Sequence, residues 1–424
     1  MLDFIVAVLS NPAIIVGLVA MVGLIALKKN FNDILKGTLK TTLGFLILSG
    51  GAGIIVGALI PFSTMFQEAF HLTGVVAEDN SLVAAVGKFL GRETALIMVI
   101  AFVINLVLAR LTPYKYVFLT GHMMWSFAGT MAVVLDQMGM KGWPLILTGA
   151  AIEGLSMVVF PAISQATVRR VTDTDDVAFG FWGSSWITLS GWVGKPFGNK
   201  SQSTEDLKVP QGLDFFRDMA VFMAIVMLLI YVFTAVFAGP GVGAKVAGGQ
   251  NYIFYAVIQA LTFVAGVLVL LQGVRMFLAE IIPAFRGIAE KLVPGARPAL
   301  DVPIFYPYAP VAVTIGFIAA LVGSLIATVL TRYIAPVVVL PSVIGMFFMG
   351  AAAGVFGNAL GGRRAAIVAG FFLGLTWPLL VAFAYPLVDV TKYGVQGLAF
   401  ASPDALIVVI LMRLVGAVAK VFGG

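Results

Sequence analysis

Four ionisable side chains fall inside or at the ends of strongly apolar stretches of this sequence: His122, Asp136, Glu153 and Arg413. An ionisable group is costly within a membrane, so each of them is a candidate functional residue. His122 occurs in the run TGHMMWSFAG, in which Trp125 and Ser126 follow within about one helical turn. A polar donor beside an aromatic face suits a sugar-like ligand, with its hydroxyl groups and stacking ring carbons. The alternative for His122 is a hydrogen bond between two helices.

The other three groups favour structural roles. Asp136 is expected to end its helix near the membrane interface. Glu153 is expected to bond across a helix pair, with ligand binding as the alternative. Arg413 is expected to snorkel or to form a pair.

Asp301 lies in LVPGARPALDVPIFYPYAP, where five prolines and one glycine exclude a continuous helix. A carboxylate held on broken backbone before an apolar span can accept hydrogen bonds from ligand hydroxyls. The alternative is an ion pair with Arg297. Asp79 and Asn80 lie in another polar, irregular stretch, and the residues alone indicate a loop there.

Composition identifies the class of protein that must position these groups. Of 424 residues, 60% are hydrophobic and 11% are charged, against about 25% charged in an ordinary soluble domain. Apolar blocks of about twenty residues, long enough to cross a ~30 Å hydrocarbon layer as helices, recur along the chain. We therefore predict an all-α polytopic membrane protein. Its net charge of +6 is attributed to Lys and Arg in cytoplasmic loops, not to nucleic-acid binding.

Motifs for catalysis are missing from the sequence. There is no Walker A, HExxH or GxSxG pattern with partners, and no Asp/Glu/His cluster has metal-ligand spacing. The chain has no cysteine, which excludes disulfides, thiolate metal sites and cysteine nucleophiles. We expect no catalytic residue, cofactor or metal, so the energy for moving a solute must come from an ion gradient or a separate protein.

About eleven transmembrane helices are predicted. They cover roughly residues 4–27, 41–62, 94–110, 117–135, 144–164, 218–238, 252–279, 308–331, 336–358, 364–388 and 403–422. Breaks are predicted at Gly50 to Gly53, Pro341, Pro378 and Pro386, and such breaks point toward a solute path. Segment 177–194 is apolar but short and rich in Gly, Ser and Trp. It is interpreted as a re-entrant hairpin, with an interfacial helix as the alternative.

The two parts of the chain on either side of residue 217 have a similar order of apolar segments and basic clusters. Each holds five or six apolar segments, and in each a basic cluster, at 28–40 or 275–297, precedes a span. This pattern predicts a single transporter unit, residues 1–424, built from inverted-repeat-like halves 1–217 and 218–424. Solute sites of such transporters lie at the repeat interface. Both basic clusters are expected on the cytoplasmic side.

Several blocks of the sequence are similar to one known family. The blocks are KGTLKTTLGFLIL at 36–48, LTGHMM at 119–124, STEDLKVP at 203–210, QGVRMFLAEIIPAFRGIAEKLVPGARPALD at 272–301, FFMGAAAGVFG at 347–357 and GGRRAA at 361–366. They are ordered along nearly the whole chain. On these blocks the chain resembles the membrane IIC component of the bacterial L-ascorbate-type phosphotransferase system.

This resemblance implies a mechanism that the residues alone do not. It implies a multi-pass homodimer in the bacterial inner membrane, in which a core domain carries the sugar and a dimerisation domain forms the contact. The core would slide as an elevator within the lipid bilayer. A cytoplasmic IIB protein, supplied with phosphate by IIA and phosphorylated on its own cysteine, would phosphorylate the delivered substrate. The chain itself would be the membrane subunit of that complex.

The resemblance also implies a set of site residues. His122 matches the histidine of the family motif and Asp301 matches its aspartate. The remaining expected substrate contacts are Met123, Met124, Trp125, Ser126, Phe181, Trp182, Asp79 and Asn80. The family commonly has Gly-His where this chain has Gly180-Phe181, and ascorbate-specific members have glutamine where it has Ser126. The expected substrate is therefore L-ascorbate or a related small carbohydrate.

Functions of another class stay open at this point. A secondary transporter or facilitator could use the same fold without a IIB partner, and Glu153 or Asp136 would then serve ion coupling. A receptor or purely structural membrane protein is a more distant alternative, because helix breaks and buried polar residues would lack a purpose.

Overall fold

A computed structural model of the chain describes residues 12–69, 73–206, 219–291 and 293–422. Among these residues, seven helices are long and apolar enough to cross a membrane. They are Phe31–Ala69, Val86–Leu111, Gly142–Thr172, Ala220–Val246, Tyr252–Ile288, Pro310–Ile334 and Val343–Leu387. A polytopic helical membrane protein is thus confirmed, while the count of eleven spans stays a prediction.

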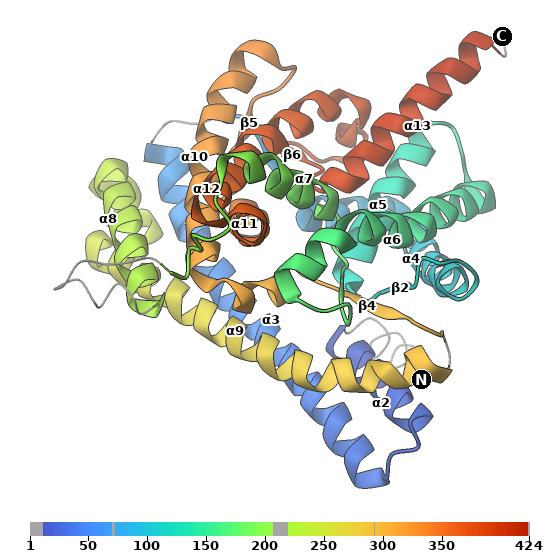
Figure 1. The fold of residues 1–424 in the computed structure, drawn as a ribbon. Helices are drawn as coiled ribbons and strands as arrows, with labels where there is room; N and C mark the ends of the chain where they lie inside the picture. The colour runs from blue at the N-terminus through green and yellow to red at the C-terminus, as the bar shows by residue number, and fades with distance from the viewer. Residues whose placement is uncertain (1–11, 70–72, 207–218, 292, 423–424) are drawn as a thin grey trace.

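Four helices pack mainly on one another and are called here the long-helix group. They are α2 (Pro12–Ala26), α3 (Phe31–Ala69), α8 (Met219–Val246) and α9 (Tyr252–Lys291). Helices α3 and α9 are the longest of the four and run side by side across the lower part of Figure 1.

The remaining long helices form a second packed body, called here the core group. They are α4 (Asp79–Leu111), α5 (Gly121–Gln137), α6 (Gly142–Thr172), α7 (Ser184–Gly194), α10 (Pro310–Ile334), α12 (Ala351–Ala384) and α13 (Pro403–Phe422). Short helical turns join them: η1 (Lys195–Phe197), η3 (Val302–Tyr308), α11 (Val343–Gly345), η4 (Met346–Gly350, a π-helical turn), η5 (Tyr385–Leu387) and η6 (Val390–Tyr393). Helix α12 is central, because it packs against both α10 and α7.

Two small parallel sheets fill the places where helices are interrupted. In one, β1 (Val75–Ala77) lies between β5 (Val339–Leu340) and β6 (Leu398–Ala399). In the other, β4 (Arg297–Leu300) lies between β2 (Tyr116–Phe118) and β3 (Ala178–Phe179). Such pairing satisfies backbone groups that no helix satisfies, which is required at membrane depth.

The predicted break at Gly50 to Gly53 is wrong, because α3 continues through it. Of these glycines, Gly51 allows close packing on α9, because a Cβ there would lie 2.3 Å from the backbone nitrogen of Leu270. A Cβ at Gly273 of α9 would likewise lie 2.2 Å from the backbone nitrogen of Leu48. Small residues at these points let the two backbones meet.

The predicted proline breaks have mixed outcomes. Helix α12 continues through Pro378, so no break occurs there, whereas Pro386 follows the helix end in η5. Pro341 does mark a break, directly after β5. The predicted spans 336–358 and 364–388 share one helical run, Val343–Leu387, which is kinked at Gly361 and Gly362. Gly362 adopts φ 68°, a left-handed conformation that favours glycine.

Strands also occur in one other predicted span and in segment 177–194, which is interpreted as a re-entrant hairpin. The predicted span 117–135 begins in β2 and continues as α5. Segment 177–194 contains β3 and α7, and the C-terminal end of α7 lies beside the C-terminal end of α6. The indole N–H of Trp192 donates to the Thr167 hydroxyl at 3.1 Å. Arg170 and Lys195 lie over the same ring, 4.9 and 4.6 Å from its centre.

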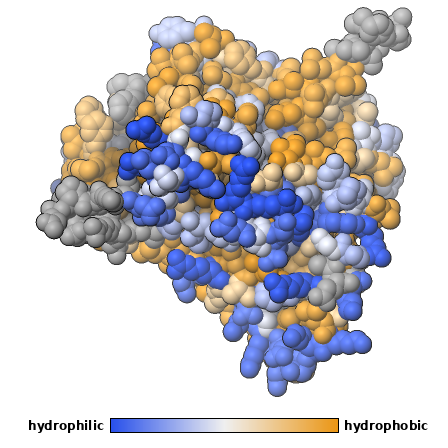
Figure 2. Space-filling model, in the orientation of Figure 1, coloured by the Kyte–Doolittle hydropathy of each residue, from blue (hydrophilic) through white to orange (hydrophobic). Residues whose placement is uncertain are grey.

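The surface has the character of a protein whose flanks contact lipid. Hydrophilic residues gather in a band across the face that Figure 2 turns to the viewer, and hydrophobic residues cover much of the flanks.

The close contact between α3 and α9 yields a first prediction. Replacing Gly51 with leucine should lower the unfolding temperature, because the new side chain would collide with the α9 backbone and overpacking costs about 1–3 kcal/mol or more. Gly53→Leu is the matched control, since a Cβ at Gly53 meets no atom within 4 Å. Thermal unfolding of the two variants in the same detergent gives the comparison. Equal melting temperatures would contradict the role of Gly51.

Candidate functional site

The candidate site lies where three parallel strands end. Asp301 directly follows β4, His122 comes four residues after β2, and Phe181 comes two residues after β3. Parallel strands place their carboxyl ends at one edge of a sheet, and ligands of α/β sheets bind at that edge. Segments far apart in the sequence thereby bring polar and aromatic residues together.

His122 and Asp301 form the polar centre of this site. The His122 Nε2 atom lies 3.5 Å from the Asp301 Oδ2 atom, and the two side chains are 44% and 26% exposed. The other carboxylate oxygen of Asp301 accepts the Val302 N–H at 2.7 Å. The alternative partner Arg297 lies 3.6 Å from Asp175 instead. The pair therefore offers donors and acceptors that are partly open to a hydroxylated ligand.

Asp79 follows β1 as Asp301 follows β4, but its surroundings differ. It begins α4, so the loop expected from the residues is wrong. Its buried carboxylate accepts the Ala401 N–H at 2.7 Å and the Ser402 hydroxyl. These bonds occupy acceptor positions that Asp301 keeps open. The side chain of Asn80 lies outside the described residues.

The first turns of α5 carry the residues that follow His122. Met124 and Ser126 are buried, whereas Met123 and Trp125 are half-buried. Of this run, His122 is the exposed member. The structure thus brings the run next to Asp301, with Trp125 as a partly accessible aromatic face.

Trp182 and Phe181 differ in accessibility. Trp182 is fully buried, its ring stacks on Phe118 at 4.6 Å between ring centres, and its indole N–H donates to the Met123 carbonyl at 2.6 Å. It therefore ties the turn after β3 to the first turn of α5. Phe181 is half-buried, with its ring parallel to Phe179 at 6.0 Å.

Asp136 lies near the end of its helix, as expected, and Arg413 forms hydrogen bonds to other segments. Asp136, next to the C-terminal end of α5, contacts Lys141 and accepts the Tyr393 hydroxyl at 2.9 Å. Arg413 donates to the Leu387 carbonyl and to the Gln137 side chain, each at 3.0 Å.

The predicted bond of Glu153 across a helix pair is wrong. Both of its carboxylate oxygens are buried, and neither has a hydrogen-bond partner within the described residues. Helix α6 packs on α4 through small and apolar residues, for example Gly154 against Ile104. Such a surface offers a carboxylate no donor.

One buried acid was missed by sequence reasoning. Asp404, in the first turn of α13, is fully buried and contacts Ser184 and Ser185 at the start of α7. The Ser402-Pro403-Asp404 run is typical of a helix start and was an available signal. Its partners on α7 could not be read from that signal, because they lie about 220 residues away.

A charged cleft of about 220 Å³ lies at the opposite edge of the same sheet, where β4 begins. It is lined by Asp175, Asp176, Ile282, Phe285, Arg286, Gly295, Ala296 and Arg297. Burial tends to raise the pKa of the Asp175 carboxyl, but the Arg169 hydrogen bond and the Arg297 charge outweigh it and hold that pKa below its usual value. Because these charges already pair with one another, the cleft is a poor match for a small carbohydrate.

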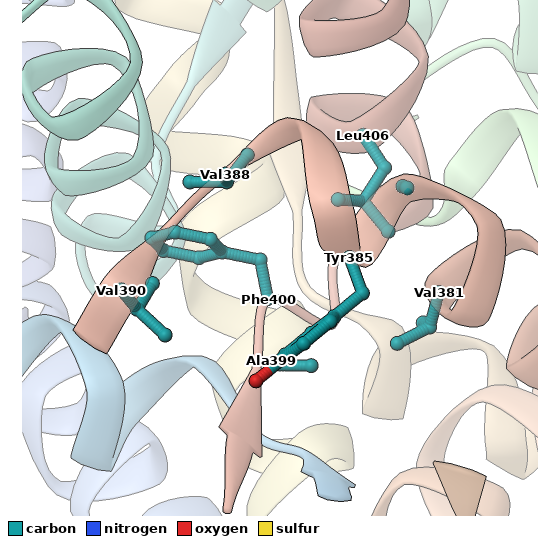
Figure 3. Close-up of a pocket in the computed structure, with 8 residues that line it drawn as sticks. Val381, Tyr385, Val388, Val390, Ala399, Phe400 and Leu406 are labelled. Atoms are coloured by element: carbon teal, nitrogen blue, oxygen red, sulfur yellow. The ribbon is translucent and has the colours of Figure 1, made fainter. Parts of the chain in front are cut away.

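Two apolar cavities are also unsuited to a carbohydrate. The pocket in Figure 3, between the end of α12, β6 and α13, has a volume of about 10 Å³ and mostly apolar walls, including Val381, Val388 and Leu406. That is roughly the room of one water molecule. A larger groove of about 760 Å³ between α3, α8 and α10 is lined almost entirely by apolar side chains.

Comparison with known proteins identifies the class of membrane protein. A family described as the PTS system sugar-specific permease component matches residues 7–404. The chain is also similar to a Mycoplasma pneumoniae protein named "Ascorbate-specific PTS system EIIC component", with 28% identity over 431 aligned positions. The alignment covers 89% of this chain and 65% of that relative's length. Because the family match spans nearly the whole chain, this integral membrane protein belongs to the family of sugar-specific permease components of the phosphotransferase system.

Proposed function

We propose that the chain carries L-ascorbate or a related small carbohydrate across the bacterial inner membrane for phosphorylation by a cytoplasmic IIB protein. The observation that carries this proposal is the partly open His122–Asp301 pair at one sheet edge. A histidine and a carboxylate supply both donors and acceptors, and the half-buried Phe181 and Trp125 supply apolar ring faces. This combination fits a small polyhydroxylated ring better than the charged or apolar cavities do.

The phosphate would come from another polypeptide. In the phosphotransferase system that this chain resembles, a cysteine of the IIB protein carries the phosphate. This chain contains no cysteine and therefore cannot take that role. A IIB protein charged by IIA would therefore meet the solute on the cytoplasmic side. The chain contributes binding and translocation, while the partner contributes the phosphoryl group.

The packing supports an elevator with two parts. The core group holds His122 and Asp301, whereas the long-helix group packs mainly on itself. We assign the core group to solute carriage and the long-helix group to the contact between two copies in a homodimer. The contacts between the groups involve short pieces, such as η3 against α9, which would ease sliding.

Two re-entrant elements fit the same scheme. The contact of Trp192 with Thr167 supports entry and exit of segment 177–194 on one side of the membrane. The bond from Arg413 to the Leu387 carbonyl supports a matching hairpin between α12 and the middle of α13. One hairpin then belongs to each proposed half, 1–217 and 218–424.

A secondary transporter is the alternative function, and Glu153 is the observation that favours it. A buried carboxylate without a hydrogen-bond partner among the described residues is strongly disfavoured in its charged form. Such a group would suit proton coupling if it gained water access in another state of the transport cycle.

The site assignment predicts the effect of substitutions at its two polar residues. His122→Ala and Asp301→Asn should each weaken solute binding by roughly tenfold or more, because a hydrogen bond to a charged group contributes about 1.5–3 kcal/mol. Asp389→Asn is the control, since Asp389 caps the η6 turn through Thr391. Isothermal titration of the purified variants with L-ascorbate, pentoses, hexoses and polyols measures the effect. Unchanged affinities in both site variants would exclude this site.

The departures from the ascorbate pattern predict altered specificity. Phe181 and Ser126 replace two polar contacts, and a buried group left unpaired costs about 1–3 kcal/mol, so L-ascorbate should bind roughly tenfold to several thousandfold more weakly than in ascorbate-specific relatives. The double variant Phe181→His with Ser126→Gln should recover part of this affinity. Tight ascorbate binding by the natural chain would refute the specificity proposal.

The coupling proposal is tested with the chain in lipid vesicles. Solute taken up should appear phosphorylated, and only when the cognate IIB protein and a phosphate donor are supplied. Analysis of the vesicle contents by mass spectrometry separates phosphorylated from unmodified solute. Accumulation of unmodified solute driven by a proton gradient, and its loss in Glu153→Gln, would instead establish the secondary transporter.

A further inference from the structure

Asp404 joins two helix starts that come from distant parts of the chain. Its carboxylate accepts the Ser184 hydroxyl at 3.2 Å, the Ser185 N–H at 3.5 Å and the Ser185 hydroxyl. Asp404 belongs to the first turn of α13 and has no exposed surface. It therefore acts within the protein and makes no contact with solute.

Helix α7 depends on this distant carboxylate for its cap. The residue at its N-cap position is Gly183, which has no side chain to accept a backbone N–H. A Cβ at Gly183 would lie 2.8 Å from the Phe181 ring, so a side chain there would displace that ring. The first N–H groups of a helix need acceptors and favour a negative charge. Asp404 supplies such an acceptor from another element, through the Ser185 N–H.

The hydrogen bonds of Asp404 continue to the candidate site. Its backbone N–H donates to the Trp182 carbonyl at 3.3 Å. The Trp182 indole in turn donates to the carbonyl of Met123, the residue after His122. Phe181 lies between Trp182 and Gly180, and the Gly180 N–H is fixed to the Leu300 carbonyl at 2.7 Å.

We propose that Asp404 is a positioning residue of the solute site. It fixes the turn 180–183. It thereby determines the positions of Phe181 and of the first turn of α5, which carries His122, relative to Asp301. This inference rests on the proposed function, because it concerns the same site. The Asp404 carboxyl oxygens contact two hydroxyls and a backbone N–H of α7, so they hold the turn at three points.

The absence of cysteine allows a test with a single spin label. A nitroxide on Phe181→Cys reports motion of the turn, and one on Leu189→Cys, further along α7, reports the helix itself. Each label is placed in the natural background and with Asp404→Asn, Asp404→Ala or Asp404→Glu, and the full chain is studied in lipid vesicles. In Asp404→Asn and Asp404→Ala, the spectrum of the Phe181→Cys label should change from that of an immobile label to that of a mobile one. In Asp404→Glu, part of the immobile component should remain. The Leu189→Cys spectrum should stay unchanged throughout.

Two outcomes would overturn the positioning role. An immobile Phe181→Cys label in both Asp404→Asn and Asp404→Ala would show that the turn needs no carboxylate. Equal loss of order at Leu189→Cys would show that Asp404 holds α7 as a whole and not the site.

His122→Ala keeps this test separate from the proposed function. That substitution should leave the label at residue 181 immobile while it weakens binding in the titration above. A mobile label in Asp404→Asn together with normal solute affinity in His122→Ala would uphold the positioning of the turn and reject the solute site.

Discussion

Backbone N–H and C=O groups at membrane depth must find partners inside the protein, and the interior of this molecule is arranged around that requirement. At six places between the described helices, a strand of two to four residues appears and pairs with strands from remote segments. Helices then begin directly beyond the strand ends. The two small sheets therefore place helix starts, and the polar residues on them, side by side in a body whose flanks are apolar.

The two central strands show how one scaffold yields two different carboxylates. Asp79 and Asp301 each stand two residues beyond an alanine paired in register, Ala77 with Ala399 and Ala299 with Ala178. Beyond the first sheet, Ser402 supplies a hydroxyl and completes the bonds of Asp79. At the corresponding strand end of the second sheet stands Phe181, which donates no side-chain hydrogen bond. The carboxylate of Asp301 consequently keeps acceptor capacity toward His122 and toward a ligand.

Sequence reasoning located the parts of this design that are local. The His122 turn and the broken backbone at Asp301 both stand out as polar or proline-rich runs in an apolar chain. The strands did not, because pieces of two to four residues have no periodicity and can pair with segments that lie more than 320 residues away, as Val76 does with Leu398. Gly51 was misread as a break because its role is set by Leu270 on another helix. Glu153 and Asp404 look alike as isolated acids, and only the packed neighbours distinguish a lone carboxylate from a helix cap.

The exchange of strands between the two parts of the chain has a consequence for biosynthesis. Strand β1 is made early, yet its neighbours β5 and β6 begin at residues 339 and 398. Until the ribosome has made residue 397, the Val76 N–H lacks the Gly397 carbonyl that accepts it in the folded protein. While the first helices are in the bilayer or beside the insertion machinery, this N–H group must therefore bond temporarily to another acceptor, such as water. The sheet can close only after β6 has been made, and a chain truncated before β6 would retain this defect in place of forming a smaller transporter.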